Sequence, residues 1–188
     1  MSGPLMDAKQ MQSDLPNRGT CHLTFTRKAN TKFSNKFKER IIEVSKYFPE
    51  LHDEFVRVGW IRPGGWARGS CWCSNTLPLK PLKISLQPNE KNFTIAHEFT
   101  HLLQARKKEE LQVPCGEKAC DLWALTRLPL ELIDDCPSYI GSRQMRNRWL
   151  IVKTRVRELA FDAIEIRKVK RQYIVWFEDE IRKLDKQF

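Results

Sequence analysis

The segment Phe93–Gln104, which reads FTIAHEFTHLLQ, constrains this chain more than any other. It places two histidines four residues apart, with a glutamate directly after the first. Residues at this spacing stand one above the other on the same face of a helix, so His97 and His101 can offer two imidazole nitrogens to one ion. Glu98 stands on the neighbouring edge. The simpler alternative is an amphipathic core helix whose histidines bind nothing.

A catalytic zinc ion usually has three protein ligands and one water, so the two histidines need a third partner. No histidine follows His101, and the upstream His22 and His52 are interpreted as surface residues. The remaining rivals are the glutamates at 109 and 110, but neither has an acidic residue after it at helical spacing. A carboxylate further along the chain is therefore the better prediction.

Glu117 is that carboxylate, because it begins a predicted helix and Asp121 follows it four residues later. Both side chains would share one face of the helix. Glu117 would bind the metal, while Asp121 would accept a hydrogen bond from the free ring nitrogen of one histidine and orient that ring. The alternative for Glu117 is a solvated glutamate that the helix dipole favours.

The two segments together resemble a known family. FTIAHEFTH is similar to the FT-[IL]-AHE-x-x-H signature of the ImmA/IrrE-type metallopeptidases. The later segment resembles that family's E-x-x-A-[ND]-x-F-A pattern through Glu117, Cys120, Asp121, Trp123 and Ala124. The resemblance implies a zincin-like fold of the gluzincin group, with His97, His101 and Glu117 as zinc ligands and Glu98 as general base.

The predicted activity is zinc-dependent peptide hydrolysis, with a peptide or protein as substrate. Glu98 would take a proton from the attacking water and pass it to the leaving amine. Tyr139, Arg127 or a backbone amide could stabilise the oxyanion, and the spacing does not select among them. The alternative function is a non-catalytic, zinc-containing basic module that binds a nucleic acid or a protein, because a fold does not guarantee an activity.

Alternating apolar residues predict short strands over 23–26, 56–60 and 82–87, and helical spacing predicts a helix over 33–48. The turn residues that follow Trp60 predict a hairpin with residues 66–73, and the strand over 82–87 is predicted to be an edge strand that pairs with substrate. The fold class is therefore α+β, with a small mixed sheet packed on the HExxH helix.

Three regions are expected along the chain. Residues 1–20 have the composition of a disordered leader, residues 21–141 form the zincin-like domain, and residues 142–188 form a basic segment of one long helix or two in tandem. Cys21 and His22 follow the leader and could cap the zinc. The six cysteines are otherwise interpreted as thiols with no assigned role, because the absence of an export signal predicts a cytoplasmic protein.

The chain carries 33 Lys and Arg against 23 Asp and Glu, a formal charge of +10. Residues 142–188 hold 13 of these basic residues and 7 of the acidic ones, so they account for more than half of the excess. Such a segment is usually a solvated helix face, but it could also bind nucleic acid phosphates. No apolar run is long enough to predict a membrane span.

Overall fold

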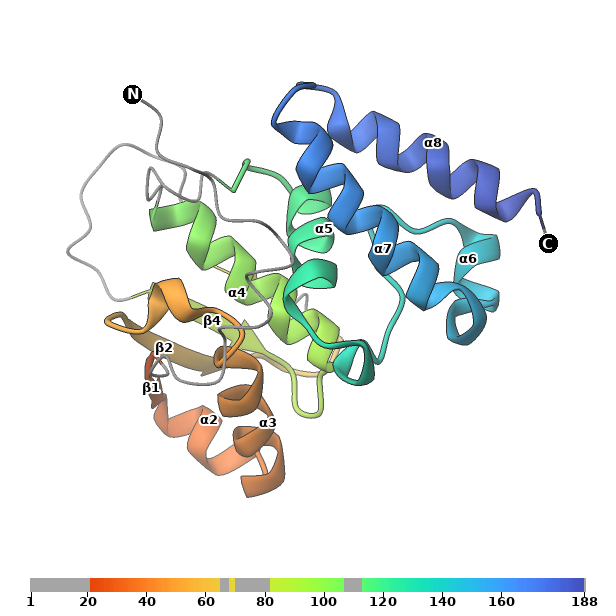
Figure 1. Cartoon of the computed structure of the whole chain (residues 1–188). Helices are drawn as coiled ribbons and strands as arrows, with labels where there is room; N and C mark the ends of the chain where they lie inside the picture. Colours follow the sequence, from red (N-terminus) through yellow and green to blue (C-terminus); the bar gives the residue numbers. More distant parts are fainter. Residues whose placement is uncertain (1–20, 65–67, 70–81, 107–112, 188) are drawn as a thin grey trace, which may run out of the picture.

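The computed structural model describes residues 21–64, 68–69, 82–106 and 113–187, which form a mixed α+β fold around a small sheet (Figure 1). The predicted leader, residues 1–20, lies outside the described residues. One cluster of buried apolar side chains runs from Cys21 to Ile181 and includes residues of both the sheet and the last helices.

Four strands make the sheet, in the order β1-β2-β4-β3. β1 (His22–Phe25), β2 (Phe55–Trp60) and β4 (Leu82–Leu86) are parallel to one another, and β3 (Arg68–Gly69) is antiparallel to β4. Burial alternates along β2 and β4, so one face of the sheet contacts the core while the other faces solvent. The predicted strands and the mixed character of the sheet are confirmed.

Two predictions about strand pairing are wrong. The predicted hairpin is not formed by the residues that the structure describes, because both sides of β2 are already paired, with β1 and with β4. β4 is not an edge strand, since Ile84 and Ser85 pair with β3 on its other side. Alternation in a sequence shows which face of a strand is buried, but it does not show which strand becomes the neighbour.

The parallel connection from β1 to β2 contains α2 (Arg27–Lys32) and α3 (Asn35–Ser45), where one helix had been predicted. Each helix has its own N-cap. The hydroxyl of Thr26 accepts a hydrogen bond from the backbone of Ala29, and that of Ser34 accepts one from the backbone of Phe37. Ser34 therefore begins a new helix within the apolar run. The 3-10 turn η2 (Pro49–Leu51) completes the crossover.

α4 (Asn92–Arg106) lies at the centre of the molecule and packs against the sheet, α3 and α5 (Glu117–Arg127). Its first turn is held by Asp134, whose carboxylate accepts hydrogen bonds from the backbone N–H groups of Asn92 and Phe93 at 3.0 and 3.1 Å. Every residue of α4 from Ile95 to Gln104 is buried. The HExxH segment is thus part of the core.

The basic C-terminal segment contains three helices instead of the one or two that were predicted. α6 (Arg143–Asn147) is short, and α7 (Trp149–Arg167) packs on α5. α8 (Tyr173–Asp185) then runs back along α7 (Figure 1). The 3-10 turn η3 (Leu130–Leu132) contacts α7. None of the helices in the described part of the chain is both long enough and apolar enough to cross a membrane.

Candidate metal centre

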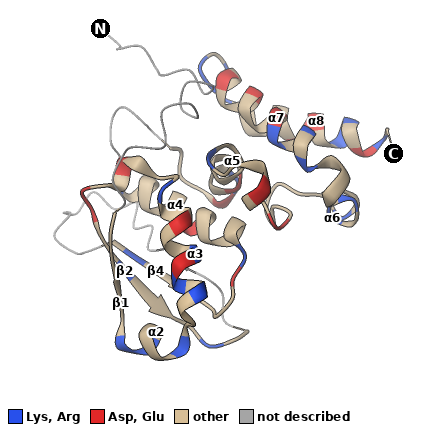
Figure 2. Cartoon of the chain, turned by 60° about the horizontal axis from the view of Figure 1, so that its bottom comes forward, with Lys and Arg blue, Asp and Glu red and all other residues tan. Residues whose placement is uncertain are grey.

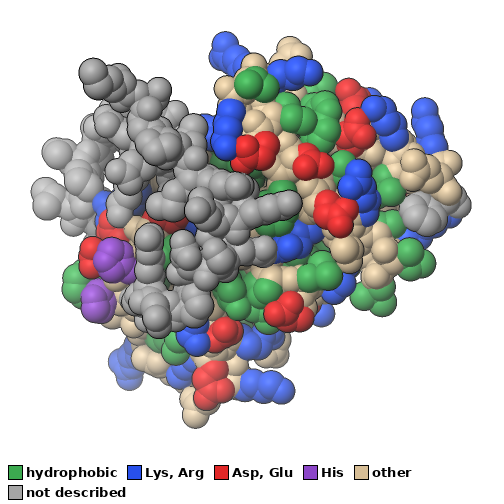
Figure 3. All heavy atoms as spheres, in the orientation of Figure 1, with side chains coloured by type: hydrophobic (Ala, Val, Ile, Leu, Met, Phe, Trp, Pro, Cys, Tyr) green, Lys and Arg blue, Asp and Glu red, His purple; other side chains and the backbone are tan. Residues whose placement is uncertain are grey.

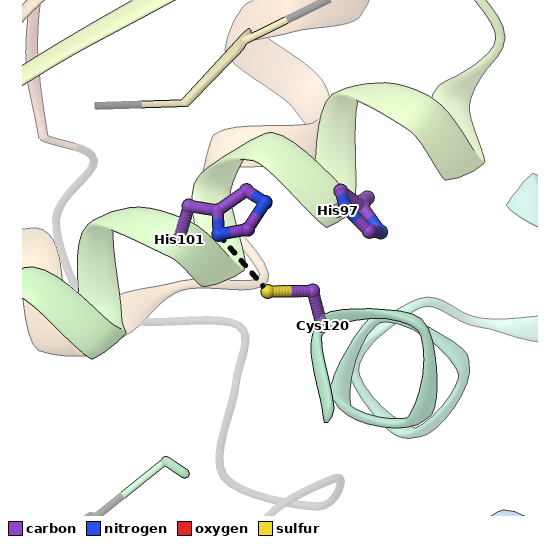
Figure 4. Close-up of side chains that lie close together, drawn as sticks. All are labelled: His97, His101 and Cys120. Carbon is purple, nitrogen blue, oxygen red and sulfur yellow. Dashed lines mark hydrogen bonds between the residues drawn. The ribbon is translucent and has the colours of Figure 1, made fainter. Parts of the chain in front are cut away.

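The two histidines of the HExxH segment project from α4 toward α5 and form the middle of a polar cluster in the core. His97 and His101 are only 6% and 7% exposed, and the centroids of their rings lie 4.9 Å apart. Figure 4 shows both rings on the side of α4 that faces Cys120. The helical spacing read from the sequence therefore brings the two imidazoles together.

Glu117, the first residue of α5, lies against both rings. Its Oε2 atom is 2.9 Å from Nε2 of His97 and 3.2 Å from Nε2 of His101. One carboxylate oxygen thus faces the same nitrogen of each imidazole. The Glu117 side chain is 47% exposed, so this side of the cluster is open to solvent.

Asp121 lies one turn further along α5 and is fully buried. Its Oδ1 atom is 2.8 Å from Nδ1 of His97, and its Oδ2 atom accepts hydrogen bonds from the backbone N–H groups of Tyr139 and Ile140 at 2.7 and 3.3 Å. The carboxylate is therefore held on two sides. It lies where the sequence predicted an orienting partner for one histidine.

Gln104 contacts Nδ1 of His101 as Asp121 contacts Nδ1 of His97. The sequence did not lead to a prediction for Gln104. Its Oε1 atom is 3.0 Å from Nδ1 of His101. Its amide nitrogen donates to the carbonyls of Pro114 and Gly116 at 2.6 and 3.2 Å, which fixes the orientation of the amide. Gln104 also ties the end of α4 to the loop that begins α5. Its position three residues after His101 on one helix face was the available signal.

These contacts determine how the two rings are protonated. Both Nδ1 atoms lie against side-chain oxygens, so the tautomer that satisfies these contacts carries its proton on Nδ1. Each Nε2 then directs a lone pair at the Glu117 carboxylate, which is also an acceptor. Three acceptors at this distance repel one another unless a proton or a cation lies between them. Two imidazole nitrogens and one carboxylate oxygen are also a donor set that zinc binds.

The surroundings shift the two imidazole pKa values in opposite directions. Burial is the largest influence on both and lowers each pKa. For His101 the neighbouring charge of His97 adds to burial, and the pKa falls below its ordinary value. For His97 the hydrogen bond and charge of Asp121, followed by the charge of Glu98, outweigh burial and raise the pKa. His101 therefore has the lower pKa of the two rings and stays neutral to a lower pH than His97 does.

Cys120 also reaches this cluster from α5. Its thiol is fully buried, and its Sγ atom lies 3.2 Å from Nδ1 of His101 (Figure 4). His97, His101 and Cys120 offer ligand atoms that all lie within 4.8 Å of one another, so this buried group could hold a metal ion. The sequence reasoning had left the cysteines without a role.

Two further predicted residues lie beside the cluster. Glu98 is 4% exposed, and its negative charge contributes to the raised pKa of His97. Tyr139 stacks on His97 with 5.5 Å between ring centroids and an angle of 21° between the rings. The pKa of Tyr139 is raised, chiefly by burial and then by the charges of Glu117 and Asp121.

Other candidates are not brought to the cluster. Arg127 ends α5, about 15 Å along the helix from Glu117, and pairs with Glu50 at 2.5 Å. It is therefore not placed to stabilise an oxyanion. His52 forms an ion-pair contact with Asp53 at 2.9 Å. The glutamates at 109 and 110 lie outside the described residues.

Cys21 and His22, the proposed cap of the zinc, belong to the far edge of the sheet. The buried Cys21 thiol hydrogen-bonds to Ser45, and its pKa is raised to about 11, chiefly by burial. His22 stacks on the exposed ring of Phe55 with 4.9 Å between centroids. The structure does not place either side chain at the histidine pair. Their predicted capping role has no support, because His22 pairs with Phe55 in the sheet and Cys21 directly precedes that strand.

Comparison with known proteins does not assign the chain to a family. No family model, no curated protein and no solved structure matches it. The candidate metal centre is therefore defined by the geometry of α4 and α5 and by the donor atoms that these two helices bring together.

Proposed function

We propose that the chain is a zinc-dependent metallopeptidase with a zincin-like site of the gluzincin type, similar to the ImmA/IrrE family. One observation carries this proposal: Oε2 of Glu117 faces Nε2 of both His97 and His101 at 2.9 and 3.2 Å. Three acceptors in this arrangement are suited to one divalent cation. The contacts at the other nitrogen of each ring support the proposal. An oxygen beside each Nδ1 favours the tautomer with the proton on Nδ1, which leaves Nε2 free to bind a cation.

The residues fit an open catalytic site. His97, His101 and Glu117 would supply three ligands, and the exposed side of Glu117 leaves room for a water or a substrate carbonyl. Zinc bound there would lower the pKa of a water to about 7 and polarise the carbonyl of the bond to be cut. Glu98 accepts the proton of the attacking water and donates it to the leaving amine.

The substrate is proposed to be a peptide or a protein, because this chemistry suits the amide bond. The expected pairing of substrate with β4 is restricted, since β3 occupies β4 at Ile84 and Ser85. Tyr139 is an exposed aromatic side chain that stacks on His97. We therefore propose that the substrate approaches the cluster from the exposed side, where Glu117 and Tyr139 lie.

Cys120 favours the second candidate, a non-catalytic zinc module that binds a partner. Thiolates are frequent ligands of structural zinc, in which all four positions are filled by protein. The His97, His101 and Cys120 group is buried, whereas Glu117 is half-exposed. If the thiol completes the coordination, no position remains for water and no peptide is cut.

Metal analysis combined with an unbiased peptide-library digest tests the two candidates. The wild type should contain about one zinc per chain, and His97→Ala should lose it. Glu98→Gln should keep the metal but lose a factor of about 100 to 10,000 in peptide cleavage, because a general base is not a ligand. Glu39→Gln changes an exposed glutamate of α3 in the same way and serves as the matched control.

The outcomes separate the candidates. Zinc in the wild type together with cleavage that Glu98→Gln abolishes supports the peptidase. Zinc without any cleavage supports the structural module. Cleavage at the wild-type rate by Glu98→Gln would refute the role of Glu98, and a wild type that binds no zinc would refute both functions.

A further inference from the structure

The connection between η3 and α6 contacts both helices of the candidate metal centre. Near its start, the carboxylate of Asp134 accepts hydrogen bonds from the first two backbone N–H groups of α4. Further along, the backbone N–H groups of Tyr139 and Ile140 donate to Oδ2 of Asp121 on α5 at 2.7 and 3.3 Å. One short connection therefore bears both on where α4 begins and on the carboxylate that faces His97.

Asp121 needs these two N–H groups because its carboxylate is removed from water. The residue is 0% exposed, and a buried carboxylate is costly unless hydrogen bonds satisfy its oxygens. Oδ1 faces Nδ1 of His97 at 2.8 Å, while Oδ2 accepts both N–H groups of the connection. The backbone of the connection thus orients the carboxylate, and the carboxylate orients the imidazole.

The same connection also places an aromatic ring on His97. Tyr139 stacks on the imidazole with 5.5 Å between the ring centroids and 21° between the ring planes. Aromatic rings at this separation attract each other. His97 is therefore held at Nδ1 by Asp121 and across the face of its ring by Tyr139.

Gly141 allows the connection to fold back on itself this closely. A Cβ atom at this position would overlap with the carbonyl oxygen of Pro137 and would lie 2.8 Å from the methyl group of Met145. The flexible methionine can move, but the carbonyl belongs to the backbone of the same connection. A side chain at position 141 would push Pro137 and Gly141 apart. Tyr139 and Ile140 lie between these two residues, so their N–H groups would move away from the carboxylate.

We propose that residues 136–141 form a positioning loop for His97, with Gly141 and Tyr139 as its positioning residues. Gly141 acts through the loop N–H groups and Asp121, and Tyr139 acts through its ring. The proposal rests on the proposed function only where zinc binding is measured. His101 is held separately, because Oε1 of Gln104 faces its Nδ1 at 3.0 Å, and it therefore provides an internal control.

Proton NMR of the metal-free full chain, with ¹⁵N-labelled histidine, tests this proposal. A buried, hydrogen-bonded imidazole N–H gives a low-field signal, and His97 and His101 should each give one from Nδ1. Gly141→Ala should shift or remove the His97 signal and leave the His101 signal in place, because the loop holds Asp121 and not Gln104. The His97→Ala variant assigns the two signals.

Tyr139→Leu separates the effect of the ring from that of the backbone, since the N–H group at position 139 remains. The Nδ1–H signal of His97 should persist, while its carbon-bound ring protons should move downfield because the ring current of the tyrosine is lost. Tyr139→Phe should keep these protons in place. Phe55→Leu is the matched control, because Phe55 is an exposed aromatic residue that stacks on His22 at the far edge of the sheet.

Competition with a chelator adds a second measurement. Gly141→Ala should lower zinc affinity about tenfold to a hundredfold, as the loss of an orienting partner does. Tyr139→Leu should lower it about twofold to tenfold, and Tyr139→Phe should retain the wild-type value. Gly59→Ala is the control for an added methyl group, because a Cβ atom there is also crowded, at 3.0 Å from Oγ of Ser85 in the sheet. It should leave zinc affinity unchanged.

Several outcomes overturn the proposal. A wild type that lacks the His97 signal has no held Nδ1–H group. A folded Gly141→Ala chain that keeps the His97 signal unchanged, or loses both histidine signals, shows that the glycine does not act on His97 in particular. If Gly141→Ala does not fold, Tyr139→Leu decides, and unchanged ring protons of His97 refute the loop. A wild type that binds no zinc refutes the proposed function, while the metal-free NMR measurements still decide the role of the loop.

Discussion

At the scale of single residues, the outer partners of the histidines explain why the two rings face the same carboxylate. Asp121 holds Nδ1 of His97, and Gln104 holds Nδ1 of His101. Gln104 also holds the loop before Glu117, since its amide nitrogen donates hydrogen bonds to the carbonyls of Pro114 and Gly116. Removing it should disturb both the tautomer of His101 and the position of Glu117.

We expect Gln104→Leu to lower metal affinity about tenfold to a hundredfold, the usual effect of losing an orienting partner of a metal-bound histidine. Asp121→Ala should have an effect of the same size, through His97. Competition with a chelator measures both. Thr100→Val is the control, since Thr100 is buried on the same helix and its hydroxyl donates to the carbonyl of Ala96 in that helix. Wild-type affinity in Gln104→Leu would contradict the assignment.

The buried thiols should be distinguishable by their reactivity. Burial is the main cause that raises the pKa of Cys21 to about 11 and that of Cys136 to about 12. At pH 8 only about one Cys21 thiol in a thousand is then ionised, and Cys136 still fewer, and the thiolate is the reactive form.

Alkylation followed by residue-resolved mass spectrometry should therefore label Cys115, which is exposed, well before Cys21 and Cys136. Raising the pH from 8 to 9 should leave both buried thiols unlabelled, because both pH values lie below their pKa. Rapid labelling of Cys136 in the folded chain would contradict its burial.

At the scale of elements, the position of α4 depends on a contact made far along the chain. Asp134 accepts hydrogen bonds from the first two backbone N–H groups of α4, and Arg40 of α3 lies 3.6 Å from the same carboxylate. Arg40 also binds Asn92 and the carbonyl of Glu90. These contacts fix where the helix begins, and so which residues face α5.

Asp134→Ala should lower the free energy of unfolding by about 1 kcal/mol, the typical effect of losing a helix N-terminal cap. Asp134→Asn should retain part of that energy, because its amide oxygen still accepts a hydrogen bond. Urea denaturation measures both variants. Asp162→Ala, an exposed position on α7, should change the value by less than about 0.5 kcal/mol. An unchanged stability in Asp134→Ala would show that the cap contributes nothing.

At the scale of the whole molecule, several of the basic residues in the C-terminal segment are engaged in contacts within the protein. Figure 2 shows basic and acidic residues interspersed along the ribbons of α7 and α8. Figure 3 shows basic and acidic side chains interspersed on the face of the molecule that is viewed in Figure 1. Four basic residues pair with an acidic residue three positions away: Arg155, Lys168, Arg182 and Lys183. Lys153 and Arg157 bind the carbonyls of Leu130 and Leu128. Fewer cations therefore remain for phosphates than the sequence suggested.

Any nucleic-acid binding by this segment should consequently be weak and independent of sequence. With about three phosphate contacts, duplex DNA affinity should fall roughly fortyfold between 50 and 200 mM salt. Fluorescence anisotropy with a labelled duplex measures this. Arg143→Ser combined with Arg146→Ser, both exposed on α6, should weaken binding further, while Lys46→Ser on the α3 side should not. An absence of binding at 50 mM salt would make these helices a scaffold only.

The sequence by itself determined the features that depend on local geometry. The spacing of His97 and His101 requires one helix face, and the alternation in β2 and β4 requires one buried sheet face. Both features follow from the regular repeat of side-chain directions within a single helix or strand. The prediction that Glu117 and Asp121 are partners of the histidines likewise depended on their four-residue spacing within one helix and on the side chains that zinc usually binds.

Only the tertiary structure decided how these elements meet. The parallel pairing of β2 with β4, and the turn of α8 back along α7, depend on contacts between distant segments. The same holds for Gln104, which orients His101 while binding the loop before α5, and for Cys120, which reaches His101 from the other helix. A periodic pattern specifies the face that an element buries. The particular atoms that meet across that face depend on the packing of α4 against α5, which no single segment contains.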